Sequence, residues 1–284
     1  LRIPDNSGLL QALRLSQQVL PMFVFDTRQI AFHPYQSQPG LVFLQQAIGE
    51  LRSAYQHWGG ELALYQGLPS PIITELVKTF GLEAVFVNRD YTPFSRQRDA
   101  ELAENCATLG VDFVSCPDCL ITEPEHLLKS DGEPYRVFTP FWKAAKQQLV
   151  PLPEALPEQP HFLRDARATL TETAAFTLPD IPAPVVAGGR QAALDCLERL
   201  SRLAEYENIR DYPAVEGTSR LSTHLKFGTC SVREAYHAIV RQLGAAHPLL
   251  RQLYWRDFFT HIAFHCPDVF GRPFLKQYEH LPWA

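Results

Sequence analysis

Short apolar runs alternate with helical patterns through the first part of the chain, and this alternation constrains the fold more than any other sequence feature. Four runs are apolar over most of their length, at residues 19–25, 62–65, 84–88 and 111–115. A strand that is apolar on both faces is typical of a parallel sheet with helices covering both sides. Helical spacing of apolar residues occurs between the runs. The sequence therefore predicts an α/β domain with a doubly wound parallel sheet over residues 1–125.

Prolines mark the end of this pattern, because seven of them fall between residues 151 and 184. Proline interrupts helices and central strands, so we expect a proline-rich linker over residues 126–185. Beyond it, apolar residues recur at helical spacing over 189–206, 231–243 and 248–264. Residues 186–284 are therefore predicted to form an all-α domain.

Composition limits the classes of protein to which the chain can belong. Hydrophobic residues make up 46% of the 284 residues and charged residues 20%, which excludes a disordered chain. No apolar run reaches the roughly 20 residues that cross a bilayer, and residues 1–25 lack the features of a signal peptide. The net charge is −5, although residues 206–284 carry nine Lys and Arg against seven Asp and Glu. We expect a soluble, cytoplasmic monomer without membrane contact. Its overall charge argues against a nucleic-acid partner, and the weak basic excess of its C-terminal part permits a DNA surface there without requiring one.

Cysteine and histidine patterns do not predict a metal site. The chain has six cysteines, and Cys116 and Cys119 form a CxxC without a second pair, which favours a reduced, structural pair over a redox or zinc site. His261, His265 and Cys266 lie within one helical pattern but lack a nearby carboxylate or second ligand pair. Neither GxGxxG nor GxxxxGK[ST] occurs, so a ligand of the first half would bind at the carboxyl ends of its strands.

Hydroxyl groups gather where a helical pattern begins after Gly217. Thr218, Ser219 and Ser222 fall within five residues there, and with free N–H groups they suit a diphosphate. A simple helix cap needs only one such hydroxyl and stays the alternative. Shortly before this segment, Tyr206 and Arg210 are spaced to share one helix face, which also fits a solvated helix end.

A second stripe lies in the last helical pattern. Gln252, Trp255, Arg256 and Phe259 are spaced i, i+3, i+4 and i+7, which places them on one side of a helix. An amide, an indole and a guanidinium on one face suit a planar ligand such as an extruded base. A Trp–Arg pair packed inside a core is the alternative at this stage.

Together these segments resemble the DNA photolyase/cryptochrome family. Residues 1–6 (LRIPDN) are similar to the end of its RDLRxxDN segment, and residues 24–26 (VFD) and 88–93 (NRDYTP) to its α/β domain. Residues 218–222 (TSRLS) resemble its flavin diphosphate loop, and residues 255–259 (WRDFF) its WR[DE]F[YF] helix. The resemblance extends over the whole chain. It implies a Rossmann-like α/β domain followed by an all-α FAD-binding domain.

The resemblance also implies an activity and a set of site residues. It implies a deoxyribodipyrimidine photolyase, a lyase in which light-excited, reduced FAD transfers an electron to a cyclobutane pyrimidine dimer flipped out of damaged DNA. The residues that it assigns to FAD are Tyr206, Thr218, Ser219, Arg220, Leu221 and Ser222. The residues that it assigns to DNA are Arg210, Gln252, Trp255, Arg256 and Phe259, of which Gln252 and Trp255 contact the lesion.

Three departures from the family pattern qualify these expectations. The dimer-repair branch usually has Glu at Gln252, so a photolyase for the (6-4) photoproduct and a cryptochrome-type photoreceptor without repair stay alternatives. Phe94 and Ser95 occupy the places of an Asn-Glu pair found with folate, which favours a deazaflavin antenna, or none. Members normally have a strand ahead of Leu1 and continue beyond Ala284. We therefore expect a chain truncated at both ends, with an incomplete helical domain and no activity by itself.

Overall fold

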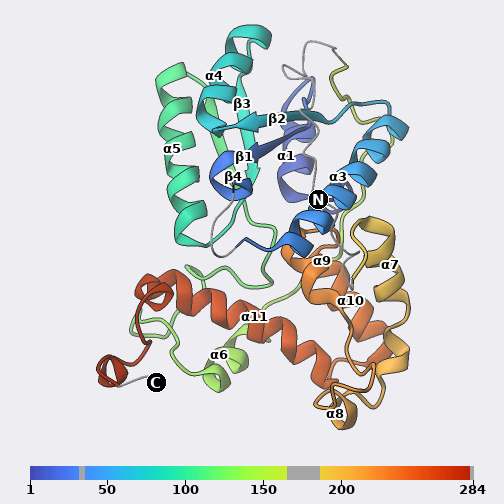
Figure 1. The fold of residues 1–284 in the computed structure, drawn as a ribbon, viewed down its shortest axis with the longest axis vertical. Coiled ribbons are helices and arrows are strands. Elements are labelled where there is room, and N and C mark those ends of the chain that lie inside the picture. The colour runs from blue at the N-terminus through green and yellow to red at the C-terminus, as the bar shows by residue number, and fades with distance from the viewer. Residues whose placement is uncertain (32–35, 165–185, 282–284) are drawn as a thin grey trace.

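Figure 1 shows the computed structural model, which describes residues 1–31, 36–164 and 186–281. An α/β half with the four strands lies at the top of this view, and a helical half lies below it. The helix α11 (Pro248–His265) crosses the helical half beneath the strands. The two halves correspond to the two fold classes that the sequence predicts for the beginning and the end of the chain.

Strands and helices alternate in the α/β half. Its strands are β1 (Met22–Asp26), β2 (Ala63–Gly67), β3 (Ala84–Asn88) and β4 (Asp112–Cys116). Its helices are α1 (Ser7–Leu15), α2 (Thr27–Ile30), α3 (Gln38–His57), α4 (Pro69–Phe80) and α5 (Pro93–Leu109). The predicted apolar runs coincide with the strands to within a few residues, which confirms the α/β pattern.

The strands are parallel but form two pairs rather than one sheet. β1 pairs with β2 and β3 pairs with β4, each in parallel over five residues. A cavity of about 1100 Å³ separates the pairs and is lined by residues 22–24 of β1, residues 84–88 of β3 and one side of α1. No described strand lies between β1 and β3. The predicted parallel arrangement is therefore confirmed, whereas the predicted single sheet is divided in two within the described residues.

Local sequence signals explain where the helices of this half begin and end. α5 begins at Pro93, directly after Thr92, whose hydroxyl oxygen accepts a hydrogen bond from the Ser95 amide at 3.2 Å. Proline fits the first turn because its missing N–H would have no helical partner there. α4 and α5 end at Gly81 and Gly110, whose φ angles of 62° and 70° are left-handed and favour glycine. These caps set the lengths of the helices that flank the strands.

The helical half packs around one core. Its α-helices are α6 (Phe138–Ala145), α7 (Arg190–Glu198), α8 (Tyr206–Ile209), α9 (Leu221–Phe227), α10 (Val232–Leu243) and α11. Its 3₁₀ turns are η2 (Leu200–Leu203), η3 (Pro267–Phe270) and η4 (Lys276–Tyr278). Buried apolar side chains from α6 to α11 form a single cluster. Among the described residues, no helix combines the length and the hydropathy that a membrane crossing requires.

Two parts of this half differ from the sequence-based expectation. The helix expected over 189–206 is broken into α7, η2 and α8, because Leu200 and Leu203 are both buried at a spacing of three residues, which suits a 3₁₀ turn. The segment expected as a linker over 126–185 contains α6, whose Phe138 and Phe141 are buried in the helical core. Residues 165–185, with three of the seven prolines between residues 151 and 184, lie outside the described residues.

Candidate functional site

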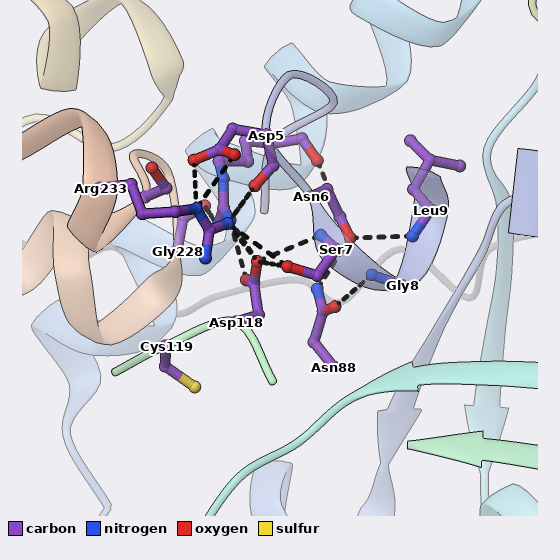
Figure 2. Close-up of polar contacts among 12 residues, drawn as sticks. Asp5, Asn6, Ser7, Gly8, Leu9, Asn88, Asp118, Cys119, Gly228 and Arg233 are labelled. Carbon is purple, nitrogen blue, oxygen red and sulfur yellow. Dashed lines mark hydrogen bonds and ion pairs between the residues drawn. The ribbon is translucent and has the colours of Figure 1, made fainter. Parts of the chain in front are cut away.

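A buried cluster of opposite charges joins the two halves of the molecule (Figure 2). Arg2 donates from Nη2 to both carboxylate oxygens of Asp118, at 2.6 and 2.8 Å. Arg233, on α10, donates from Nε to both carboxylate oxygens of Asp5 at 3.0 and 2.9 Å, and from Nη2 to Asp118 at 3.1 Å. Arg2, Asp5 and Asp118 are at most 5% exposed. This cluster ties the first residues, the segment after β4 and the helical half together.

Burial and ion pairing shift the pKa of a buried acidic residue in opposite directions. Burial disfavours the charged carboxylate of Asp118, but the adjacent Arg2 and Arg233 guanidinium groups outweigh it, so the Asp118 pKa lies below its usual value. The same balance, with Arg190 as the partner at the start of α7, lowers the pKa of Glu234 on α10. These carboxylates are therefore ionised at neutral pH.

The amino end of α1 is satisfied by side chains of the same region (Figure 2). The amide of Ser7 donates to Asp118, that of Gly8 to Oδ1 of Asn88 at 2.8 Å, and that of Leu9 to Oδ1 of Asn6 at 3.1 Å. The amides that could bind an anion at this helix end are thus occupied. This agrees with the absence of a phosphate-binding glycine motif from the sequence.

The structure places Tyr206 and Arg210 together at α8. Tyr206 is buried in the helical core, and the Arg210 guanidinium carbon lies 5.6 Å from the centre of its ring. Arg210 also lies 3.7 Å from the exposed carboxylate of Asp211. The two residues therefore share one side of the helix, with the aromatic ring inside and the cation at the surface.

The hydroxyl-rich segment precedes α9 and presents most of its side chains to solvent. Arg220 has a φ of 56° and directly precedes the helix, and the Ser219 hydroxyl accepts a hydrogen bond from the Leu221 amide at 3.4 Å. Thr218 and Ser222 are exposed, and their hydroxyls have no hydrogen-bond partner within the described parts of the chain. Leu221 is buried and anchors the segment to the helical core. The hydroxyls of Thr218 and Ser222 are thus available to a ligand.

The stripe on α11 is half-buried, with its outer end in solvent. Gln252, Trp255 and Arg256 are half-buried, and Phe259 is 63% exposed. The Trp255 ring stacks on Phe138 of α6 with centroids 3.6 Å apart and contacts the Phe259 ring at 5.5 Å. The contacts of Trp255 therefore fit both interpretations of the sequence, a residue packed in the core and a residue that faces a planar ligand. One side of the ring packs on the core, and the residue still reaches the surface.

Arg256 differs from the other members of the stripe in what it binds. Its Nη1 donates to the backbone carbonyl of Cys119, in the segment that follows β4. The guanidinium thus contacts the connection between the two halves of the molecule. The structure brings Trp255 and Phe259 into contact, whereas Arg256 is directed towards residue 119.

Neighbouring side chains of α11 bind the backbone of the same segment, a feature that the sequence analysis missed. Asp257 accepts hydrogen bonds from the amides of Ile121 and Thr122 at 2.8 and 3.0 Å. Burial raises its pKa to about 7. His261 accepts from the Tyr135 amide at 3.1 Å, and burial lowers its pKa to about 4. A single acidic residue inside an apolar helical pattern was the sequence signal for this contact.

The residues that the sequence analysis weighed as metal or redox groups have other contacts. His265 lies 3.0 Å from the carbonyl of Pro124, and no cluster of potential metal ligands occurs in the described parts of the chain. Cys116 and Cys119 are free thiols whose Sγ atoms contact Gln11 and the carbonyl of Arg89, both at 3.0 Å. Burial raises the Cys119 pKa to about 12, which leaves a poor nucleophile.

Comparison with known proteins identifies a family to which a chain with this α/β half and helical half belongs. The model of the DNA photolyase family matches residues 1–161, which is more than half of the chain. The chain belongs to the DNA photolyase family. A relative in this family, the deoxyribodipyrimidine photo-lyase of a Synechococcus species, is 33% identical, and the match covers 100% of this chain and 62% of that protein.

Solved structures of the family share the fold. A bacterial class III photolyase from Agrobacterium tumefaciens has a TM-score of 0.87 at 26% identity, covering 100% of this chain and 61% of that one. An archaeal photolyase from Sulfolobus tokodaii, solved with two FAD molecules, has a TM-score of 0.84 at 32% identity, covering 99% and 61%. The family and fold class expected from the sequence are confirmed. The chain spans about 61% of the length of these photolyases.

Proposed function

We propose that the protein is a deoxyribodipyrimidine photolyase that binds FAD and damaged DNA through its helical half. The observation that carries this proposal is the surface of α11, where Trp255 and Phe259 form an aromatic face in a chain whose relatives are named as photolyases. When bound, reduced FAD supplies a light-excited electron to the pyrimidine dimer and regains it after two carbon–carbon bonds have broken. The residues of this chain bind, orient and desolvate the partners of that transfer.

The segment before α9 fits the diphosphate of FAD. The exposed hydroxyls of Thr218 and Ser222 are free to donate hydrogen bonds, and Ser219 and Arg220 lie between them. A diphosphate has several negatively charged oxygens that accept such bonds. Buried Leu221 keeps this segment against the helical core. We assign Tyr206, which contributes to the same core, to the flavin site as well.

The surface of α11 fits a base that has left the DNA stack. Phe259 and the outer part of Trp255 supply apolar area on which a base can stack, and the Gln252 amide donates and accepts hydrogen bonds. Arg210 at α8 presents a cation to the phosphate backbone. Arg256 acts here by joining α11 to the backbone at Cys119.

Gln252 is the observation behind the two alternative functions. An amide cannot supply a proton, whereas the glutamic acid that is usual in the dimer-repair branch can. This difference fits a photolyase for the (6-4) photoproduct or a flavin photoreceptor without repair. A deazaflavin antenna, or none, follows from Phe94 and Ser95 on the same family pattern. The domain boundaries at 125 and 185, the cytoplasmic location and the monomeric state also belong to this proposal.

Light-driven repair is the direct test of function. The reduced protein is illuminated with DNA that contains either a cyclobutane dimer or a (6-4) photoproduct, and restored thymine is measured. Restoration from the cyclobutane dimer supports the proposal, and restoration from the (6-4) product supports the first alternative. Binding of damaged DNA without any restoration would instead support the photoreceptor.

Flavin binding is tested at the hydroxyl-rich segment. Ser219→Ala and Ser222→Ala each remove a donor to a charged phosphate, worth about 1.5–3 kcal/mol, so each should weaken FAD retention by roughly 10- to 150-fold. Ser53→Ala is the matched control, because the Ser53 hydroxyl donates to Gly49 within α3. Equal retention in both variants, their double variant and the control would disprove the assignment.

Stacking on the lesion is tested at Trp255. Stacking of a base on an aromatic ring contributes about 1–3 kcal/mol, so Trp255→Ala should weaken binding of damaged DNA by roughly 5- to 150-fold. Binding of undamaged DNA should change little, because backbone contacts dominate it. Phe258→Ala removes a buried ring of the same helix and serves as the control for lost packing. Similar loss of both kinds of binding in the Trp255 variant would show that the ring is structural.

A further inference from the structure

The cavity between the two strand pairs is bordered on one side by a backbone edge of β1. The Pro21 carbonyl accepts a hydrogen bond from the Ala63 amide at the start of β2 at 2.9 Å, so the odd-numbered residues of β1 face β2. Backbone groups of successive residues in a strand point to opposite sides. The N–H and C=O of Val24 therefore face away from β2, towards the cavity that this residue lines.

β3 presents a matching edge from the other side of the cavity. The Glu83 carbonyl accepts a hydrogen bond from the Asp112 amide of β4 at 2.9 Å, so the odd-numbered residues of β3 face β4. The N–H and C=O of Phe86 therefore face the cavity, which this residue also lines. In the part of the chain that the structure describes, no strand pairs with either edge. Two rows of backbone donors and acceptors thus border one space.

The two edges also run in the same direction. Arg28 lies in α2, directly after β1, and its guanidinium carbon is 5.0 Å from the centre of the ring of Phe94, at the start of α5 after β3. The carboxyl ends of β1 and β3 therefore lie at the same end of the cavity. A single strand placed between them can pair in parallel with both edges.

Helices flank the cavity on both faces of the strands. Figure 1 shows α4 and α5 on one side of the strands and α1 and α3 on the other. Phe23 packs on the apolar cluster of α1 and α3, and Val24 on that of α4 and α5. β3 is half-buried at all five positions and β1 at four of five, whereas the first three residues of β2 are buried. The cavity thus leaves two apolar strands incompletely covered.

We propose that this cavity binds an extended, apolar peptide segment as a fifth strand, parallel to β1 and β3 and hydrogen-bonded to both. The segment would pair with the cavity-facing backbone groups of Val24 and Phe86. A strand buried on both faces is apolar at nearly every position, so the partner is an apolar run of about five residues without proline. With this strand bound, the two pairs become the single parallel sheet that the sequence predicts. The cavity is separate from the α9 and α11 surfaces, so the proposal does not depend on flavin or DNA binding.

Binding of a short peptide to the whole chain tests this proposal. The probe is the heptapeptide of residues 83–89 (EAVFVNR), which carries the apolar run of β3 with a charge at each end. At about 100 times its Kd, it should raise the melting temperature by roughly 5–10 °C. The same peptide with Phe86→Pro lacks a central N–H and should not bind. Equal shifts with both peptides, or no shift with the first at millimolar concentration, would overturn the proposal.

Amide hydrogen exchange locates the bound peptide. The amides of Val24 and Phe86 face the cavity and should exchange more slowly when the peptide is bound. The amides of Phe23 and Val85 face β2 and β4, so their exchange serves as the internal control. Slower exchange elsewhere with no change at Val24 and Phe86 would contradict the proposed position. Protection of these two amides that increases with protein concentration alone would identify a second copy of the chain as the occupant, and would also contradict the proposal.

Val24 offers a matched pair of variants. Val24→Pro removes the cavity-facing N–H but no hydrogen bond to β2, a change that an edge strand tolerates. Val24→Ala shortens the side chain and keeps the N–H. The Pro variant should bind the peptide roughly 5- to 150-fold more weakly than the Ala variant, because a peptide carbonyl stays without a donor. Equal binding by the two variants would refute strand pairing. If the Pro variant does not fold, the proline-containing peptide gives the same comparison on the unaltered chain.

Discussion

Asp118 gives the sharpest test of what joins the two halves of the molecule. Its side chain accepts hydrogen bonds from Arg2, Ser7 and Arg233, and it is 5% exposed. Asp118→Ala would leave Arg2, itself 3% exposed, without its carboxylate partner. Breaking a buried ion pair in this way costs about 3–5 kcal/mol, because a charge stays buried without compensation. We therefore expect a decrease in melting temperature of roughly 6–20 °C.

The assays are thermal melting, which gives the melting temperature, and urea unfolding, which gives the free energy, both followed by circular dichroism with Asp131→Ala as the control. Asp131 is exposed and lies 3.5 Å from Lys129, so solvent screens this pair and its loss should change the stability far less than the loss of Asp118. The double variant Arg2→Met/Asp118→Leu should recover part of the stability, because it removes both charges of the pair. A loss below about 1 kcal/mol for Asp118→Ala, equal to that of the control, would refute the reasoning.

Three further predictions concern pH and backbone packing. Because the folded pKa of Asp118 lies below its unfolded value near 3.9, the stability that this carboxylate contributes is present above that value and is lost as pH falls through the folded pKa. In a plot of melting temperature against pH, Asp118→Ala should therefore reduce the decrease at acidic pH. The Asp257 pKa is raised to about 7, so its stabilisation is complete below about pH 4 and is lost as pH rises through about 7, a decline that Asp257→Asn should remove from the same profile. In unfolding titrations, Gly49→Ala in α3 should stabilise the protein by about 0.5–1 kcal/mol, since nothing lies within 4 Å of the added Cβ. Gly8→Ala should destabilise it, because the added Cβ would lie 2.9 Å from the Asn88 oxygen that accepts a hydrogen bond from the Gly8 amide.

The strands and most helices could be predicted because their signals are local. Apolar runs and glycine caps located the α/β elements, and helical spacing located α10 and α11. α6 escaped prediction because its eight residues are short for a periodic pattern and include Pro140. The break between α7 and α8 escaped for a related reason, since Leu200 and Leu203 satisfy an α-helical and a 3₁₀ pattern equally well.

The charged cluster at Arg2 could not be predicted, because its partners are distant in sequence. Arg2 and Asp118 are 116 residues apart, and Asp5 and Arg233 are 228 residues apart. Single-sequence patterns report neighbours along a helix or strand, and they carry no signal for such pairs. The stripe on α11 could be predicted from the sequence for the opposite reason, because one helix supplies all of its members.

The other contacts at the candidate site were not predicted from the sequence because they are made with backbone groups. Arg256 and Asp257 bind the main chain at residues 119–122, and a backbone carbonyl or amide looks the same at every position of a sequence. The helix therefore has two sides with different contacts, which its sequence presents as one motif. One side, with Trp255 and Phe259, faces outwards, and the other fixes the helix to the segment that follows β4. Because both sides belong to one rigid helix, a change at Asp257 that alters this attachment should also change the direction in which Trp255 points.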